Sequence, residues 1–343
     1  MRLRMVVCLI GMSLAGDFSA VGEVPAGKAL IRYEFHRIRM GTPFTLVLYA
    51  ASEAVANAAA DAAFDRIGQL DRIFSDFDPD SELSRLCRSS GPGHPVSVSR
   101  ELGHVLTRSL ALSERTEGAF DVTIGPAVLL WRKSRRRKML PTPSQLADAR
   151  RRIGFRAVHF NRKQGSVELT KAKMRLDFGG IAKGYAGDEA LAVLRKRGLT
   201  RALIDGGGDV VAGDAPPGKR GWTIGIAPLD QPDSNPSRFL LVQNAAVATS
   251  GDAYRYVEIA GKRYSHIVDP QTGLGLTRRC SVSVLAPDGL TADSLASALC
   301  VLGPHCGLPL VEETPGTAAL IVQREQERTV TYESARLHAF IEH

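Results

Sequence analysis

Short apolar segments separated by glycine-rich turns fill the chain from residue 201 to residue 286. Runs of this length, bounded by turns, are typical of strands joined by hairpins, and such strands pair antiparallel. Apolar residues also alternate over 29–35 and 43–49, on either side of the turn Gly41-Thr42-Pro43, which predicts another hairpin. The chain is therefore expected to build a mostly antiparallel sheet.

Helical patterns alternate with these strands. Ser52 precedes an alanine-rich stretch and is a good helix cap, and Lys196-Arg197-Gly198 is a good helix end. Thr291 is predicted to cap the last helix. The predicted fold class is α+β, a single domain of about residues 28–343 with helices packed on the sheet. The predicted helices include 52–74, 99–116, pieces of 126–152, the segment that ends at Gly198, and 291–302.

The N-terminus has the pattern of a secretory signal peptide. Arg2 and Arg4 precede an apolar stretch of 11 residues, 6–16, and small residues follow. The stretch is shorter than the about 20 residues that span a bilayer. We therefore assign residues 1–22 to a signal peptide and expect a periplasmic protein. The alternative is an uncleaved anchor in the inner membrane.

The net charge of +8 comes largely from one run, RKSRRRK at 132–138. Such a run is most often a solvated surface segment, and the alternative is a patch for an acidic membrane surface or an acidic partner. No basic face interleaved with aromatic residues is present, so nucleic acid is not an expected partner.

Four cysteines follow the signal peptide, and none forms a CxxC motif, so the spacing typical of zinc sites is absent. In an exported protein Cys300 could pair with Cys306, or either could pair with Cys280. Buried free thiols are an equally good interpretation.

The segment DFGGIAKG at 177–184 places a glycine turn between a strand and a helix. It matches neither the dinucleotide-binding fingerprint nor the P-loop. However, a helix that begins near Gly180 directs free N–H groups outward, and Lys183 in its first turn is disfavoured unless an anion lies beside it. The segment is either a phosphate site or an ordinary connection with an exposed lysine.

Two further segments carry polar groups. IDGGGDVV at 204–211 indicates close backbone approach, with Asp209 available to a ligand or a turn. The hairpin predicted over 253–268 carries His266, just before the turn DPQTG at 269–273. A neutral imidazole there could accept a hydroxyl proton, although a lone histidine is more often bonded within its hairpin.

Asp293 and Ser297 are four residues apart, so they share one face of the predicted helix. A carboxylate and a hydroxyl suit Mg²⁺, which completes its shell with water and substrate phosphate. The alternative is an ordinary acidic residue in a first helical turn.

Taken together and in this order, the motifs resemble those of the ApbE family, the FAD:protein FMN transferases. The match covers most of the chain after the signal peptide. The matching segments are MGTPF (40–44), DPDSELSRL (78–86), GAFDVTIGP (118–126), DFGGIAKGYAGDEA (177–190), GGD (207–209), TSGDAYRY (249–256), HIVDPQTG (266–273) and ADSLASA (292–298). Phe77 replaces the expected tyrosine, Cys87 a common asparagine, and Ser297 the usual threonine.

The resemblance implies an ApbE-like (T-fold-like) domain and assigns roles to residues. His266 would be catalytic. Mg²⁺ would be held by the Gly180 carbonyl, Asp293 and Ser297. The residues that would bind FAD are Met40, Phe77, Ala119, Phe120, Asp121, Lys183, His266, Ile267 and Val268.

The implied reaction transfers FMN from FAD to a Thr or Ser hydroxyl of a partner protein and releases AMP. The family suggests an acceptor flavoprotein of a membrane respiratory complex. Two alternatives are an FAD pyrophosphatase, in which water is the acceptor, and a periplasmic flavin-binding protein without turnover.

Overall fold

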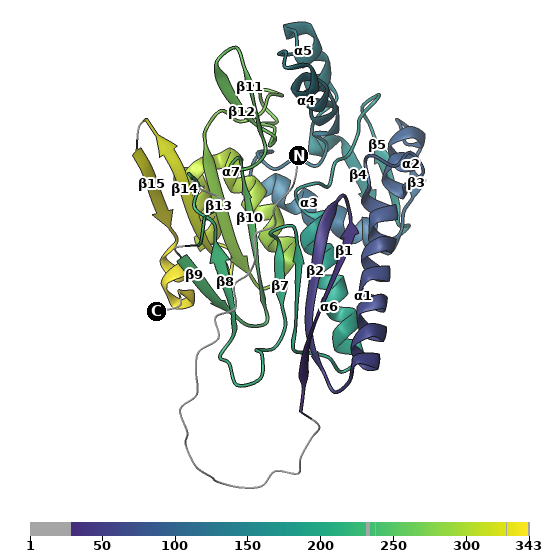
Figure 1. Ribbon diagram of the computed structural model, residues 1–343. Helices are drawn as coiled ribbons and strands as arrows, with labels where there is room; N and C mark the ends of the chain where they lie inside the picture. The colour runs from purple at the N-terminus through teal and green to yellow at the C-terminus, as the bar shows by residue number, and fades with distance from the viewer. Residues whose placement is uncertain (1–28, 231–233, 237, 327, 342–343) are drawn as a thin grey trace.

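The computed structural model describes residues 29–341, apart from 231–233, 237 and 327 (Figure 1). The predicted signal peptide, 1–22, lies outside the described residues.

An eight-stranded sheet runs through the middle of the molecule, and every neighbouring pair in it is antiparallel. The first hairpin of the chain forms one edge and the last hairpin the other. In spatial order the strands are β1 (Ile31–Arg39), β2 (Thr42–Ala50), β6 (Ala202–Gly206), β7 (Val210–Ala212), β10 (Ala245–Gly251), β13 (Cys280–Ala286), β14 (Ala318–Glu325) and β15 (Arg328–Glu333).

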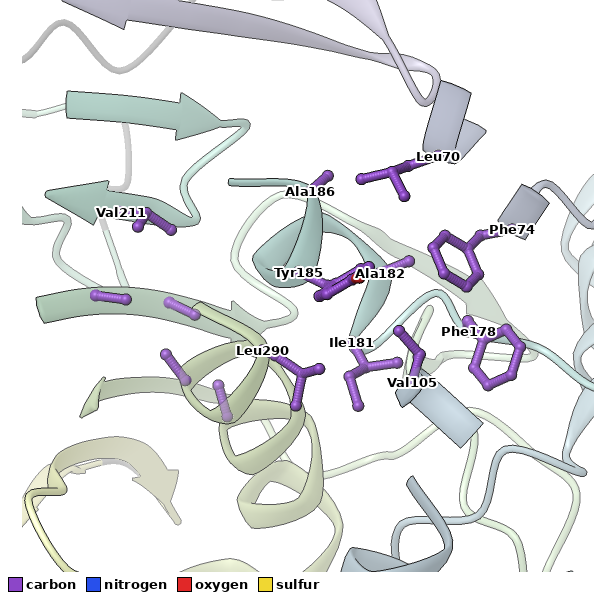
Figure 2. Close-up of a cluster of buried hydrophobic side chains, with 14 of the residues drawn as sticks. Leu70, Phe74, Val105, Phe178, Ile181, Ala182, Tyr185, Ala186, Val211 and Leu290 are labelled. Atoms are coloured by element: carbon purple, nitrogen blue, oxygen red, sulfur yellow. The ribbon is translucent and has the colours of Figure 1, made fainter. Parts of the chain in front are cut away.

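Three helices cover one face of this sheet: α1 (Glu53–Phe74), α6 (Ala182–Lys196) and α7 (Gly289–Glu312). Four alanines of α1 are buried and allow close approach to α6: Ala56, Ala59, Ala60 and Ala63. Around α6, Phe74 of α1 meets the rings of Phe178 and Tyr185 edge-on, at centroid distances of 5.7 and 5.9 Å (Figure 2). This core fixes where α6 begins.

The other face of the sheet has its own core. Leu46 and Leu48 of β2 point to the helices, whereas Val47 between them joins the second cluster, as strand alternation requires. The hairpin of β8 (Trp222–Ile226) and β9 (Arg238–Val242) covers this second face together with η2 (Ala335–Phe340).

The remaining elements flank these layers. The hairpin of β11 (Tyr256–Ile259) and β12 (Lys262–Ser265) lies beside α4 and α5 at the top of Figure 1. A buried tryptophan, Trp131 of α4, joins them. The other elements are α2 (Glu82–Ser89), β3 (Val96–Ser97), α3 (Arg100–Arg115), α4 (Gly125–Arg137), α5 (Pro143–Arg151), η1 (Phe155–Ala157), β4 (Val158–Asn161) and β5 (Ser166–Leu169).

The predicted α+β class, with helices on a mostly antiparallel sheet, is confirmed. Ser52 caps α1 as predicted, with its side chain accepting from the N–H of Val55 at 3.4 Å. The cap predicted at Thr291 is wrong. Asp288 caps α7 and accepts from the N–H of Thr291 at 2.7 Å. Asp288 was missed because an Asp-Gly pair also fits a turn.

Helix α7 is longer than predicted and is bent at Gly303, whose φ of 74° is not helical. Within the described residues it is the one helix with the length and apolar content to cross a membrane. Its most apolar window is 61% buried inside the fold, and its residues belong to the main core, which explains that composition.

Of the cysteines, Cys280 and Cys300 are buried free thiols, whereas Cys306 is an exposed free thiol. The structure therefore has the unpaired state that the sequence left open.

Candidate functional site

The predicted glycine turn lies between a buried segment and the start of α6. The N–H of Gly179 donates to the Asp177 carboxylate at 2.8 Å, which closes the turn. Helix α6 begins at Ala182, and Ile181 before it supplies no side-chain cap. In place of such a cap, Oδ2 of Asp293 in α7 accepts from the N–H of Gly184 at 3.1 Å, and the N–H of Ala182 donates to the Phe178 carbonyl at 2.9 Å.

Lys183 lies in that first turn, as predicted, and forms an ion pair with the buried carboxylate of Asp209. The anion that compensates this lysine is thus supplied by the glycine loop after β6. The turn between β1 and β2 packs closely against the same loop. A Cβ on Gly207 would lie only 2.5 Å from Thr42 Oγ1. Two glycine segments that are separate in the sequence form one wall.

The three predicted metal ligands are brought together at this wall. A Cβ added to Gly180 would lie 2.7 Å from Ser297 Oγ and 3.6 Å from the Phe120 ring. Ser250 of β10 lies next to them, with its hydroxyl 3.4 Å from Ser297 Oγ. Only a residue without a side chain leaves the space in front of the Ser297 hydroxyl open.

Asp293 is buried beside them, and its Oδ2 accepts from the N–H of Gly184 at 3.1 Å. Burial raises the pKa of this carboxyl, against the charge of Lys183, which lowers it. A carbonyl, a hydroxyl and one buried carboxylate are all hard oxygen donors, so the set fits Mg²⁺. No group of three His, Cys, Asp or Glu side chains suited to a metal occurs among the described residues, and the predicted set has only one such side chain.

A glycine contact between α6 and α7 places Asp293. A Cβ on Gly184 would lie 2.0 Å from the Gly289 carbonyl oxygen and 2.9 Å from Asp293 Cβ. Asp188, one turn later on α6, accepts from the N–H groups of Gly289 and Leu290 at 2.7 and 2.9 Å. The glycines of DFGGIAKG are therefore needed for helix packing as well as for the turn.

His266 directly follows β12, as predicted. Its N–H donates to the Arg255 carbonyl at 3.0 Å, and its Nδ1 lies 3.2 Å from the same oxygen. Burial, followed by the positive charges of Arg255 and Arg135, lowers the pKa of His266 from 6.5 to about 4. The charge of Lys183 contributes as well, so His266 lies within electrostatic reach of the α6 site. At neutral pH the imidazole can accept a proton.

Met40 and Phe77 are each held by a contact with a charged side chain. The N–H of Met40, in the turn of the first hairpin, donates to Asp71 at 3.0 Å. Phe77 is 77% exposed, and the guanidinium of Arg132 stacks on its ring at 4.2 Å. Arg132 also pairs with Asp177, three residues before Gly180, so this exposed ring is tied to the glycine turn.

The remaining predicted contacts are mostly buried. Asp121 accepts bonds from both the N–H and the hydroxyl of Thr123, at 2.8 and 2.7 Å, and from the N–H of Phe155 at 3.1 Å. Its carboxylate thus organises the loop, and Ala119 and Phe120 before it are held by bonds to Thr116. Ile267 packs against the main core, and Val268 is buried with Trp131.

Two pairings in the site have no clear signal in the sequence. Within IDGGGDVV, Asp209 is only a weak candidate for a ligand contact, yet it pairs with Lys183 of DFGGIAKG. Arg135 was counted only within the basic run, yet its charge acts on His266. No local pattern reports such pairings; the only signal was the unsuitable position of Lys183 in a first helical turn.

The fold and the site together define a class. In this α+β protein, a lysine in a first helical turn, a set of hard oxygen donors and a neutral histidine lie at one end of the sheet. Such a site suits an enzyme acting on a phosphate-containing substrate.

Comparison with known proteins gives the family. The ApbE family model matches residues 40–321, and this chain belongs to the ApbE family. An FAD:protein FMN transferase from Treponema pallidum is 33% identical over 337 residues, covering 94% of this chain and 90% of that protein. One from Klebsiella pneumoniae is 29% identical, covering 96% and 94%.

Solved structures agree with this assignment. The flavin transferase ApbE from Vibrio cholerae superposes with a TM-score of 0.81 at 26% identity, covering 91% of this chain and 99% of that one. The ApbE protein from Thermotoga maritima gives 0.81 at 28% identity, covering 91% and 100%. The resemblance inferred from the motifs is confirmed.

Proposed function

We propose that this chain transfers FMN from FAD to a Thr or Ser hydroxyl of a partner protein. The acceptor oxygen bonds to the FMN phosphorus, the bond from that phosphorus to the bridging oxygen breaks, and AMP leaves with this oxygen. The observation that carries the proposal is the convergence of Lys183, Asp293, Ser297 and Gly180 at the start of α6.

Lys183, in the first turn of α6, binds the pyrophosphate. Lys183 already balances the charge of Asp209, so its ammonium is held in place before FAD arrives. Binding then needs little rearrangement, because the positive end of the helix and the cation are preorganised.

The Gly180 carbonyl, Asp293 and Ser297 would hold Mg²⁺. When bound, the ion would neutralise charge on the pyrophosphate and so favour departure of AMP. The ion would also supply a countercharge to the buried carboxylate of Asp293. Because Gly180 has no side chain, Ser297 Oγ stays accessible.

His266 accepts the proton of the attacking hydroxyl. Its pKa of about 4 keeps it neutral in the free protein at physiological pH. An anionic pyrophosphate opposes the charges of Arg255 and Arg135, so its arrival raises that pKa and makes His266 a better base.

The rest of FAD contacts the surrounding loops. Phe77 offers its exposed ring to stack on an aromatic group, and Met40 lies at the neighbouring turn. The backbone of 119–121 and of 266–268 supplies the remaining contacts, since the Asp121 carboxylate is already used within the protein.

The acceptor is proposed to be a flavoprotein of a membrane respiratory complex, and the reaction to take place in the periplasm. The N-terminal sequence pattern supports this location. A direct test is to co-express candidate acceptor domains with and without this chain and to measure their intact masses. A gain of one FMN that depends on the chain supports the proposal. FMN and AMP released without any covalent flavin would instead indicate an FAD pyrophosphatase.

A further inference from the structure

The basic run at the end of α4 is largely uncompensated. Arg132 pairs with Asp76 and Asp177. Across the described part of the chain, the other five cations of the run form no ion pair. Four of them, Lys133 and 136–138, are exposed. Cations in the last turn of a helix interact favourably with the helix dipole. The dipole explains why basic residues are tolerated at the end of α4, but not why the run contains so many of them.

The fold directs this run to the surroundings of His266. Trp131 of α4 donates its indole N–H to the Ser265 carbonyl at 2.9 Å, next to His266. Arg135 follows Trp131 by four residues, so it lies on the same side of α4, facing the β11–β12 hairpin. On the hairpin itself, the carbonyl of Arg255 accepts a hydrogen bond from the backbone N–H of His266.

Arg135 and Arg255 therefore form a pair of like charges beside His266. Burial, then the charges of Arg255 and Arg132, lowers the pKa of Arg135. The Nε of Arg135 is buried and has no hydrogen-bond partner among the described residues. Holding two guanidiniums together without a carboxylate costs free energy, which an incoming anion would offset.

Large apolar side chains border these cations. Met139 and Leu140, after α4, are 66% and 42% exposed, and Tyr254 and Tyr256, at the hairpin, are 50% and 42% exposed. Tyrosine, methionine and arginine are the residues enriched at protein interfaces. We call residues 133–140 and 254–256 the α4–hairpin rim.

We propose that the α4–hairpin rim binds an acidic segment of the acceptor protein, with carboxylates close to the Thr or Ser that receives FMN. This proposal rests on the function proposed above. Lys183 serves the FAD phosphates, and the exposed cations of the rim, Lys133 and 136–138, are left for a second anion. The exposed Met139, Tyr254 and Tyr256 beside these cations favour a protein partner over a lipid surface, because such side chains are enriched at protein interfaces.

The test compares two labelled peptides in binding to the full chain by fluorescence anisotropy. One carries a threonine flanked by aspartates, and the other has asparagines in their place. The test variant is Arg136→Glu/Arg137→Glu at the end of α4. The matched control is Lys196→Glu/Arg197→Glu, an exposed basic pair at the end of α6. Both pairs terminate a helix, so both changes remove the same dipole contribution.

We expect the acidic peptide to bind the wild type about tenfold more tightly than the neutral one, with the preference falling at high salt. The α4 variant should lose this preference and the α6 control should keep it. Equal binding of the two peptides, or equal loss in both variants, would overturn the proposal. So would α4-dependent binding to phosphatidylglycerol vesicles without a peptide preference, which would assign the run to a lipid surface.

Transfer of FMN is measured in the same samples, which separates the two proposals. Selective binding without any covalent flavin in the wild type would count against the transferase and leave the rim intact. Equal transfer to both peptides would count against the rim alone.

Discussion

The ammonium group of Lys183 pairs with the carboxylate of Asp209, and this contact joins the start of α6 to the glycine loop after β6. The pair lies next to Asp293 and within electrostatic reach of His266, since the charge of Lys183 acts on the pKa of both. One cation therefore connects the buried carboxylates, the helix N-terminus and the histidine.

Replacing Lys183 with alanine should lower kcat/KM for FAD by about 100-fold, because the pyrophosphate loses a preorganised positive charge. Steady-state kinetics with FAD and an acceptor domain measure this. The change also leaves Asp209 buried without its partner, so Lys183→Ala/Asp209→Asn is needed to separate activity from folding. Lys196→Ala, at the far end of α6, should have no effect. Wild-type kinetics in the folded double variant would show that Lys183 does not bind the substrate.

Gly180→Ala should raise the Mg²⁺ concentration needed for half-maximal activity. Its Cβ would lie 2.7 Å from Ser297 Oγ, so the hydroxyl must move away from the carbonyl of residue 180. Such overpacking should also cost about 1–3 kcal/mol of unfolding free energy. A Mg²⁺ titration of activity and a thermal melt test both effects. Gly91→Ala is the control, because a Cβ there meets nothing within 4 Å. An unchanged Mg²⁺ requirement would argue against Gly180 and Ser297 as ligands.

His266→Gln should reduce transfer by about 100- to 10,000-fold, the usual range for a lost general base, while FAD still binds. Flavin fluorescence measures the binding, and intact mass of the acceptor measures the transfer. His159→Gln, at an exposed histidine, is the control. Loss of FAD binding in step with loss of transfer would assign His266 to substrate binding alone.

His266 also predicts a dependence of stability on pH. Its pKa is about 4 in the folded chain and 6.5 in an ordinary setting, so between these values the unfolded chain binds more protons. The free energy of unfolding contributed by this group therefore falls as the pH drops from 6.5 towards 4. Urea titrations across that range should show a steeper loss for the wild type than for His266→Gln. Parallel curves would mean that the pKa of His266 is not depressed.

Much of the fold could be predicted because its signals are local. Ser52, the hairpin turns and the alternation of β2 each depend on residues within one element. The end of α6 before Gly198 and the position of Lys183 in the first turn of that helix were also visible in the sequence. The error at the start of α7 was local as well, since Asp288 and Thr291 are both acceptable caps.

The pairings within the site could not be predicted in the same way. Lys183 and Asp209 are 26 residues apart, and Gly184 and Asp293 are 109 apart. Such contacts follow from the order of strands in the sheet and from the crossing of α6 and α7. The order of the motifs along the chain identified the family, but only the packing showed that Arg135 lies close enough to act on His266.

The most direct test of the central claim is the stoichiometry of the reaction with purified components. The chain is incubated with FAD, Mg²⁺ and an acceptor domain, and both AMP and covalently bound FMN are counted. The account predicts one AMP for each FMN attached to a Thr or Ser of the acceptor, and loss of both products with Asp293→Ala. AMP and free FMN accumulating while the acceptor mass stays unchanged would contradict it.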